Sequence, residues 1–238
     1  MTRRASVCCW LALACAWAAP PALAEEDRPA KVVVRVHPDA VVEIDGEKMT
    51  QDGEVRRFTT PRLTPGKKYS YTLKATWTED GQRRSVTRKV QIQAGREARA
   101  DLRLPWLGYA PWAPGVRSGH PTLTVHNGTL TDAVVKVIRT GGKEKLVRSF
   151  YVPRGKSFTA GEVPAGRYFL RVGFGSDWDM SARRFTAGRS FSETEPFDII
   201  EEATAGGVRF SRMSVTLHKV VGGTFKSDPI SEDQFDKK

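Results

Sequence analysis

The sequence predicts an all-β protein with two small antiparallel β-sandwich domains, joined by a Pro/Gly/aromatic linker and preceded by a signal peptide. Apolar and polar residues alternate through most of the chain, as in strands with one buried face. Asp-Gly, Asn-Gly and Gly-Gly pairs recur between these runs, where tight turns need a positive φ. The expected segments are a signal peptide (1–24), a short N-terminal segment (25–30), a first sandwich (31–104), the linker (105–118), a second sandwich (119–226) and a polar tail (227–238) that is loosely held at the domain edge.

The first 24 residues have the pattern of a secretory signal peptide. Two arginines, Arg3 and Arg4, precede an apolar run of about 15 residues, which is shorter than the ~20 residues that cross a bilayer. A small-residue site ends at Ala24, so we expect cleavage there and an exported chain that begins at Glu25, without a transmembrane span. The expected location is periplasmic, at the cell surface or extracellular.

All three cysteines, Cys8, Cys9 and Cys15, lie in this leader, so the exported chain is predicted to be free of cysteine. Two alternatives involve the same segment. The residues before Cys15 loosely resemble a lipoprotein signal, and Arg3-Arg4 is compatible with twin-arginine export. General secretion is preferred, because neither alternative has the apolar residues that its signal requires at the neighbouring positions.

The charge of the exported chain predicts anionic partners. Removing Arg3 and Arg4 from the 38 basic residues leaves 36 against 27 acids, a formal charge of +9. Outside the cytoplasm such a surface favours an anionic polysaccharide or another envelope component, and nucleic acid is not expected. The basic residues are spread along the chain, so the alternative is that the charge only confers solubility.

In the first domain, the clearest strand is Tyr69 to Trp77, whose odd-numbered residues are apolar. The Asp80-Gly81 pair connects it to a second run, Arg84 to Gln93, which predicts an antiparallel hairpin. Other runs with the same period and the turns at Asp45-Gly46 and Thr64-Pro65-Gly66 bring the expected total to six or seven strands.

The linker follows, with three prolines and two glycines between Pro105 and Gly115 that cannot sustain a strand or helix. Its aromatic residues, Trp106, Tyr109 and Trp112, can form a platform for sugar rings, but packing against the domains is the preferred interpretation. Beyond the linker the two-residue period resumes, and turn signals separate roughly seven strands.

Residues 31–104 resemble the repeat domain of exported planctomycete proteins, which is itself similar to PEGA domains. The resemblance is carried by Val41-Val42-Glu43-Ile44-Asp45-Gly46, Arg57-Phe58-Thr59-Thr60-Pro61, Leu63-Thr64-Pro65-Gly66, Tyr69-Ser70-Tyr71-Thr72-Leu73, Trp77 and Val86-Thr87-Arg88. It implies an extracytoplasmic β-sandwich module of the cell envelope and no catalytic residues. In the second domain, residues 158–168 are weakly similar to carboxypeptidase-regulatory-like and collagen-adhesin B-type sandwiches.

The candidate ligand-binding residues are Asp177, Trp178, Asp179, Arg183 and Arg184, which we expect in one loop after a strong strand. The carboxylates can hydrogen-bond sugar hydroxyls while the indole stacks on a ring, or they can hold Ca²⁺ with backbone oxygens. The structural interpretation, which is preferred, is that Trp178 closes the end of the sandwich while the acids cap turns and pair with the two arginines.

Catalytic residues, a cofactor and a metal site are not expected. The exported chain has no cysteine nucleophile, no Gly-x-Ser-x-Gly elbow, and no familiar spacing among its four histidines. We therefore predict a non-enzymatic cell-envelope protein, a structural or binding module that contacts an anionic glycan or wall polymer. The alternatives are an exported hydrolase or accessory subunit for an acidic polysaccharide, and an adaptor that binds an envelope protein through its edge strands.

Overall fold

The computed structural model describes residues 26–112, 117–218 and 226–237. The predicted leader, the cleavage site at Ala24 and Glu25, and the three cysteines lie outside them. The described residues form 18 strands and one helix of five residues, so the all-β prediction is confirmed. No helix in these parts of the chain is long and apolar enough to cross a membrane.

The N-terminal strands form two sheets that face each other over one core. The first sheet has the order β4 (Val55–Leu63), β1 (Arg28–Arg35) and β7 (Glu97–Asp101), in which β1 and β7 are parallel. The second sheet has the order β3 (Glu47–Lys48), β2 (Val41–Ile44), β5 (Tyr69–Glu79) and β6 (Gln82–Ile92). The first sandwich was expected to begin at residue 31, after a separate segment 25–30. It begins earlier, because β1 starts at Arg28 and Ala30 is part of the buried core.

The hairpin of β5 and β6 forms as the alternation predicts. Leu73, Ala75 and Trp77 are buried, and the polar residues between them lie on the other face. The turn residues Asp80 and Gly81 have φ of 50° and 72°, the left-handed values that a two-residue hairpin turn requires. Asp45-Gly46 connects β2 and β3 in the same way, so both predicted hairpin turns are confirmed.

The C-terminal strands form a large sheet, a small sheet and a projecting hairpin. The large sheet has the order β10 (Lys145–Val152), β9 (Asp132–Arg139), β12 (Gly166–Asp179), β13 (Arg184–Thr194) and β18 (Ser227–Pro229), and β14 (Phe197–Ile199) also pairs with β12. The small sheet is β11 (Ser157–Ala160), β8 (Thr122–His126) and β17 (Arg212–Thr216), with β8 and β17 parallel. The hairpin is β15 (Glu201–Thr204) and β16 (Gly207–Phe210).

The expected number of strands in 119–226, roughly seven, is too low, since ten lie in its described residues and β18 follows in the predicted tail. The additional strands are short pieces of three or four residues, for which a two-residue period is not recognisable in the sequence.

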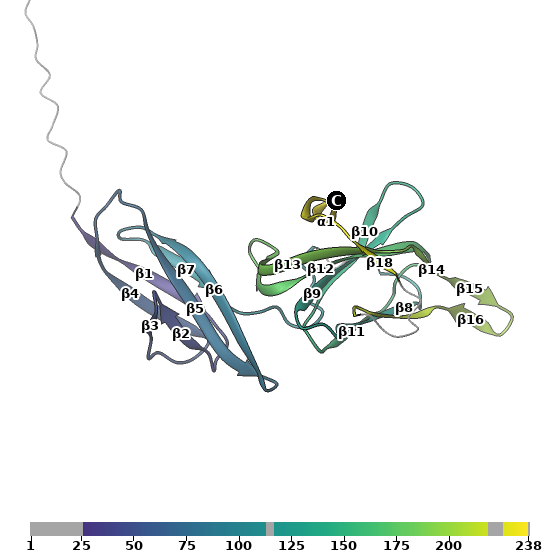
Figure 1. Ribbon diagram of the computed structural model, residues 1–238, viewed down its shortest axis with the longest axis horizontal. Coiled ribbons are helices and arrows are strands. Elements are labelled where there is room, and N and C mark those ends of the chain that lie inside the picture. Colours follow the sequence, from purple (N-terminus) through teal and green to yellow (C-terminus); the bar gives the residue numbers. More distant parts are fainter. Residues whose placement is uncertain (1–25, 113–116, 219–225, 238) are drawn as a thin grey trace, which may run out of the picture.

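Figure 1 shows β1–β7 gathered at one end of the molecule and β8–β18 at the other. Each group has its own hydrophobic core. The division into two domains stays a prediction, and these separate cores are the reason to keep it.

The large sheet is covered on both faces. One face packs on the main C-terminal core, and the other carries a second apolar cluster with Tyr151, Trp178, Phe185 and Phe235, which we call the outer cluster. Seven of the eight residues of β9 are consequently buried. The period of two predicted which residues share a face, but it did not predict that the polar face would also be covered.

The tail after residue 226 contributes to this cover, which corrects the expectation of a loosely held tail. Strand β18 pairs with the edge of β13, and helix α1 (Glu232–Asp236) begins with a capping box formed by Ser231 and Gln234. The ring of Phe235 is only 4% exposed and packs in the outer cluster. Phe235 and its neighbour in the cluster, Ile230, thus fix a segment that is mostly polar.

The linker lies along the exposed edge of β10. The Gly108 N–H donates to the Tyr151 carbonyl at 2.8 Å, and the Tyr151 N–H donates to the Tyr109 carbonyl at 2.8 Å. Gly108 has φ of 78°, and a Cβ there would lie 2.2 Å from the ring of Phe158, so no other residue fits. Trp112 packs in the outer cluster, as the packing interpretation predicts, whereas Trp106 remains 66% exposed.

We predict that Phe235→Ala lowers the free energy of unfolding by about 3 kcal/mol, because truncating a buried aromatic ring leaves a cavity. Urea denaturation of the full chain measures the effect, with Asp233→Ala, an exposed position of the same helix, as the control. Equal stability of the two variants would show that the tail does not hold the outer cluster together.

Candidate functional site

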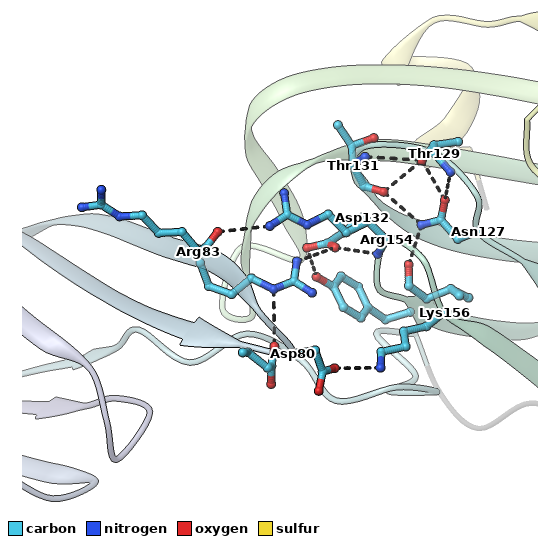
Figure 2. Close-up of polar contacts among 12 residues, drawn as sticks. Asp80, Arg83, Asn127, Thr129, Thr131, Asp132, Arg154 and Lys156 are labelled. Carbon is cyan, nitrogen blue, oxygen red and sulfur yellow. Dashed lines mark hydrogen bonds and ion pairs between the residues drawn. The ribbon is translucent and has the colours of Figure 1, made fainter.

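A buried polar network joins the N-terminal strands to the C-terminal strands, and Figure 2 shows it. At its centre is Asp132, 5% exposed, at the start of β9. Its carboxylate accepts hydrogen bonds from the Tyr151 hydroxyl at 2.6 Å and the Arg154 N–H at 2.9 Å, and Nη1 of Arg84 lies 3.2 Å away. Arg84 belongs to β6 and is itself only 8% exposed. Burial, with the nearby charge of Asp132, raises the pKa of Tyr151 well above its ordinary value, so this hydroxyl remains a donor.

Two exposed contacts extend the network. Nζ of Lys156 lies 2.7 Å from the carboxylate of Asp80, and Arg154 donates to the Arg83 carbonyl at 3.1 Å. The hydrogen bond from Lys156 lowers the pKa of Asp80. Asn127 holds the loop behind them, since its side-chain amide donates to the carbonyls of Thr131 and Val152 (Figure 2).

The predicted site residues lie beside this network. They form the end of one strand, a turn and the start of the next strand, whereas a single loop was expected. Asp177, Trp178 and Asp179 end strand β12, Arg183 lies in the following turn and Arg184 begins β13. The structure therefore extends the strand through residues that were expected to form a loop.

The carboxylates pair with Arg88 of β6, rather than with Arg183 and Arg184 as expected. Asp177 forms an ion pair with Arg88 and accepts the Thr87 N–H at 2.9 Å. Arg88 also donates to the Trp178 carbonyl at 2.8 Å, and its Nε lies 3.5 Å from Asp179. Both side chains of the main pair are largely buried, with 11% and 12% of the Arg88 and Asp177 side chains exposed. The expected turn cap is present, because Asp179 accepts the Ser181 and Ala182 N–H groups.

These contacts remove the geometry that ligand binding by this set required. Trp178 is 1% exposed and packs on Phe185 and Trp112, so neither face of its indole is open to a sugar ring. Asp177 and Asp179 are engaged by Arg88 and backbone N–H groups, so they are not a free pair of carboxylates in a substrate cleft. In the described residues, no group of three or more His, Cys, Asp or Glu side chains is arranged to hold a metal.

A different site lies on the outer face of the large sheet, where a groove of about 510 Å³ is lined by apolar and basic side chains. We call it the lysine groove. Its apolar walls are Trp112, Ile138 and Leu146. Its basic side chains come from β9, the β9–β10 loop, β10, the β12–β13 turn and the segment after α1, and they are Lys136, Lys143, Lys145, Arg183 and Lys237. Arg183 is the predicted site residue that contributes to it.

The lysine groove has an excess of positive charge. Its two acids are already paired, Glu144 with Arg171 at 2.9 Å and Asp236 with Lys136 at 3.7 Å. The other four cations, Lys143, Lys145, Arg183 and Lys237, are exposed and form no ion pair with the described part of the chain. Their charges are therefore available to an anionic ligand.

Lys136 lies at the inner end of the groove and is 4% exposed. Its ammonium donates to the Phe235 carbonyl at 2.7 Å and lies 4.1 Å from the centre of the Trp112 ring and 4.2 Å from that of Phe235. Burial lowers its pKa to about 8, although the negative charge of Asp236 acts to raise it. The ammonium thus positions Trp112 and the tail by cation–π contacts.

Sequence reasoning missed four of the five basic residues of the lysine groove. Lys143 and Lys145 directly follow the Gly141-Gly142 turn, so a cluster of cations at a turn was a visible signal. Lys136 stands on the polar side of an alternating strand, where an exposed side chain is the ordinary expectation.

Comparison with known proteins adds no identification: no family model matches the chain, and neither the curated proteins nor the solved structures give a match.

We predict that Arg88 and Asp177 are energetically coupled. A double-mutant cycle with Arg88→Ala and Asp177→Ala should give a coupling energy of about 1–3 kcal/mol, because a largely buried charged hydrogen bond contributes this much. Urea denaturation measures the four proteins. Additive effects would mean that this contact does not hold β6 against the end of β12.

A second prediction concerns pH. Since the pKa of Lys136 falls to about 8 on folding from an unperturbed 10.5, the unfolded chain binds more protons between these values. The wild type should therefore gain stability relative to Lys136→Met as pH rises from about 8 toward 10.5, by at most about 1.4 kcal/mol per pH unit. Urea denaturation across this range tests it, with Lys145→Met as the exposed control. A constant difference between wild type and Lys136→Met would contradict the prediction.

Proposed function

We propose that this chain is a non-enzymatic, exported cell-envelope protein, a structural or binding module that contacts an anionic glycan or wall polymer through the lysine groove. One observation supports this most: four exposed cations without ion-pair partners in the described chain converge on a groove with an aromatic wall.

The shape of the lysine groove suits a polymer better than a small anion. Its volume of about 510 Å³ accommodates more than one charged group, and the cations lie on separate elements around it. Lys143, Lys145 and Lys237 carry flexible ammonium groups, which attract charge without imposing the fixed geometry of a bidentate site. Trp112 and Leu146 offer apolar surface against which a sugar ring can lie.

The proposed location rests on the sequence of residues 1–24 and on the resemblance of residues 31–104 to an envelope repeat domain. An exported protein meets acidic polysaccharides and anionic envelope polymers, which is the ligand class that the groove suits by its charge.

The test is binding of the full chain to polygalacturonate, with neutral dextran as the uncharged polymer, at low and high salt. We predict that the triple variant Lys143→Gln, Lys145→Gln and Arg183→Gln binds polygalacturonate about tenfold more weakly, because exposed charge contacts contribute 0.2–1 kcal/mol each. High salt should weaken wild-type binding through screening.

The control removes three exposed basic residues outside the groove, with the variant Arg62→Gln, Lys67→Gln and Lys68→Gln. It changes the net charge by the same amount and should retain most of the affinity. Equal losses in both triple variants, or binding that does not respond to salt, would refute the lysine groove as the site.

A further inference from the structure

The N-terminal sheets enclose a second cavity, of about 580 Å³, on the side where their edge strands β3 and β4 lie. We call it the side cleft. Two of its wall residues, Val32 and Leu73, are fully buried core residues, and Ile44, Met49, Phe58 and Tyr71 are half-buried around them. The interior is therefore apolar and continuous with the hydrophobic core. Its volume falls in the range of pockets that hold small molecules.

The entrance of the side cleft has the opposite charge from the chain as a whole. It carries two carboxylates, Asp45 and Glu47, and neither lysine nor arginine lines it, although the chain has a formal charge of +11. Asp45 accepts the Thr72 N–H at 2.7 Å, so one of its oxygens is held in place. Glu47 is exposed and has no ion-pair partner in the described chain. The hydroxyl of Tyr71 likewise makes no hydrogen bond to the described residues.

An added β-strand is hindered at the adjacent edge of β4, because the outward N–H and carbonyl of Arg57 are already used. The side-chain amide of Gln51 accepts the Arg57 N–H at 2.9 Å and donates to the Arg57 carbonyl at 2.6 Å, as a neighbouring strand would. Further along β4, Pro61 has no N–H, and its carbonyl accepts the Thr60 hydroxyl at 2.7 Å. This edge is protected against strand addition, so a small molecule is the better occupant.

We propose that the side cleft binds a small amphipathic cation, an amine with an apolar or aromatic body. The body enters between Phe58, Met49 and Leu73, where it is removed from water. The ammonium group stays at the entrance and pairs with Glu47 and the free oxygen of Asp45. This site is independent of the lysine groove, which selects ligands of the opposite charge.

Isothermal titration of the full chain with 4-phenylbutylamine and with 4-phenylbutyrate tests the proposal, because the two probes share an apolar body and differ in the sign of the head group. The amine should bind about fivefold more tightly than the carboxylate, the ratio that corresponds to an exposed charge pair of about 1 kcal/mol. Glu47→Lys should abolish this preference. Asp52→Lys makes the same charge change at an exposed position outside the cleft and should keep it.

Chemical shift changes on titration with the amine should centre on Met49, Phe58 and Tyr71. Absence of amine binding, equal binding of the two probes, or equal effects of the two lysine variants would overturn the proposal. Because polygalacturonate binding is measured at a different site with different variants, failure of one proposal does not imply failure of the other.

Discussion

The ion pair between Arg84 and Asp132 is the contact on which the relation of the two groups of strands depends. Both residues are almost completely buried, and a buried charge is tolerated only when its partners compensate for lost hydration. Tyr151 and the backbone of Arg154 complete that compensation for the carboxylate. Each charge therefore requires the other, and the pair fixes β6 against the start of β9. Arg88 lies four residues further along β6, and the same strand therefore brings it to Asp177.

The outer cluster performs a second positioning task. Tyr151 belongs to both the buried polar network and this cluster, and it packs near Trp178, which in turn contacts Trp112. Trp112 and Phe235 then hold the ammonium of Lys136 between them. A continuous set of aromatic contacts thus connects the junction of the two strand groups with the inner end of the lysine groove. The groove is a product of packing on the outer face, since its walls come from segments far apart in the sequence.

The sequence predicts the strands and hairpin turns well, because alternation and Asp-Gly pairs act locally. It did not predict what covers each face. Asp177 has a partner 89 residues away, and Arg183, which is its neighbour in the sequence, faces the lysine groove instead. Lys136 occupies a polar position in a regular alternation, yet Trp112 of the linker and Phe235 of the tail cover it. Long-range contacts of this kind leave no periodic trace in a single sequence.

The parallel pairings of β1 with β7 and of β8 with β17 have a consequence for the order in which the protein can fold. In each group the first strand lies at the centre of its sheet, and one of its neighbours is a strand from the far end of the same segment. A chain that emerges with its N-terminus first cannot complete the β1 sheet before Asp101, nor the β8 sheet before Thr216. Non-local closure of this kind slows folding. Each core thus remains open during synthesis until its last strand is available, and the N-terminal core can close well before the C-terminal one.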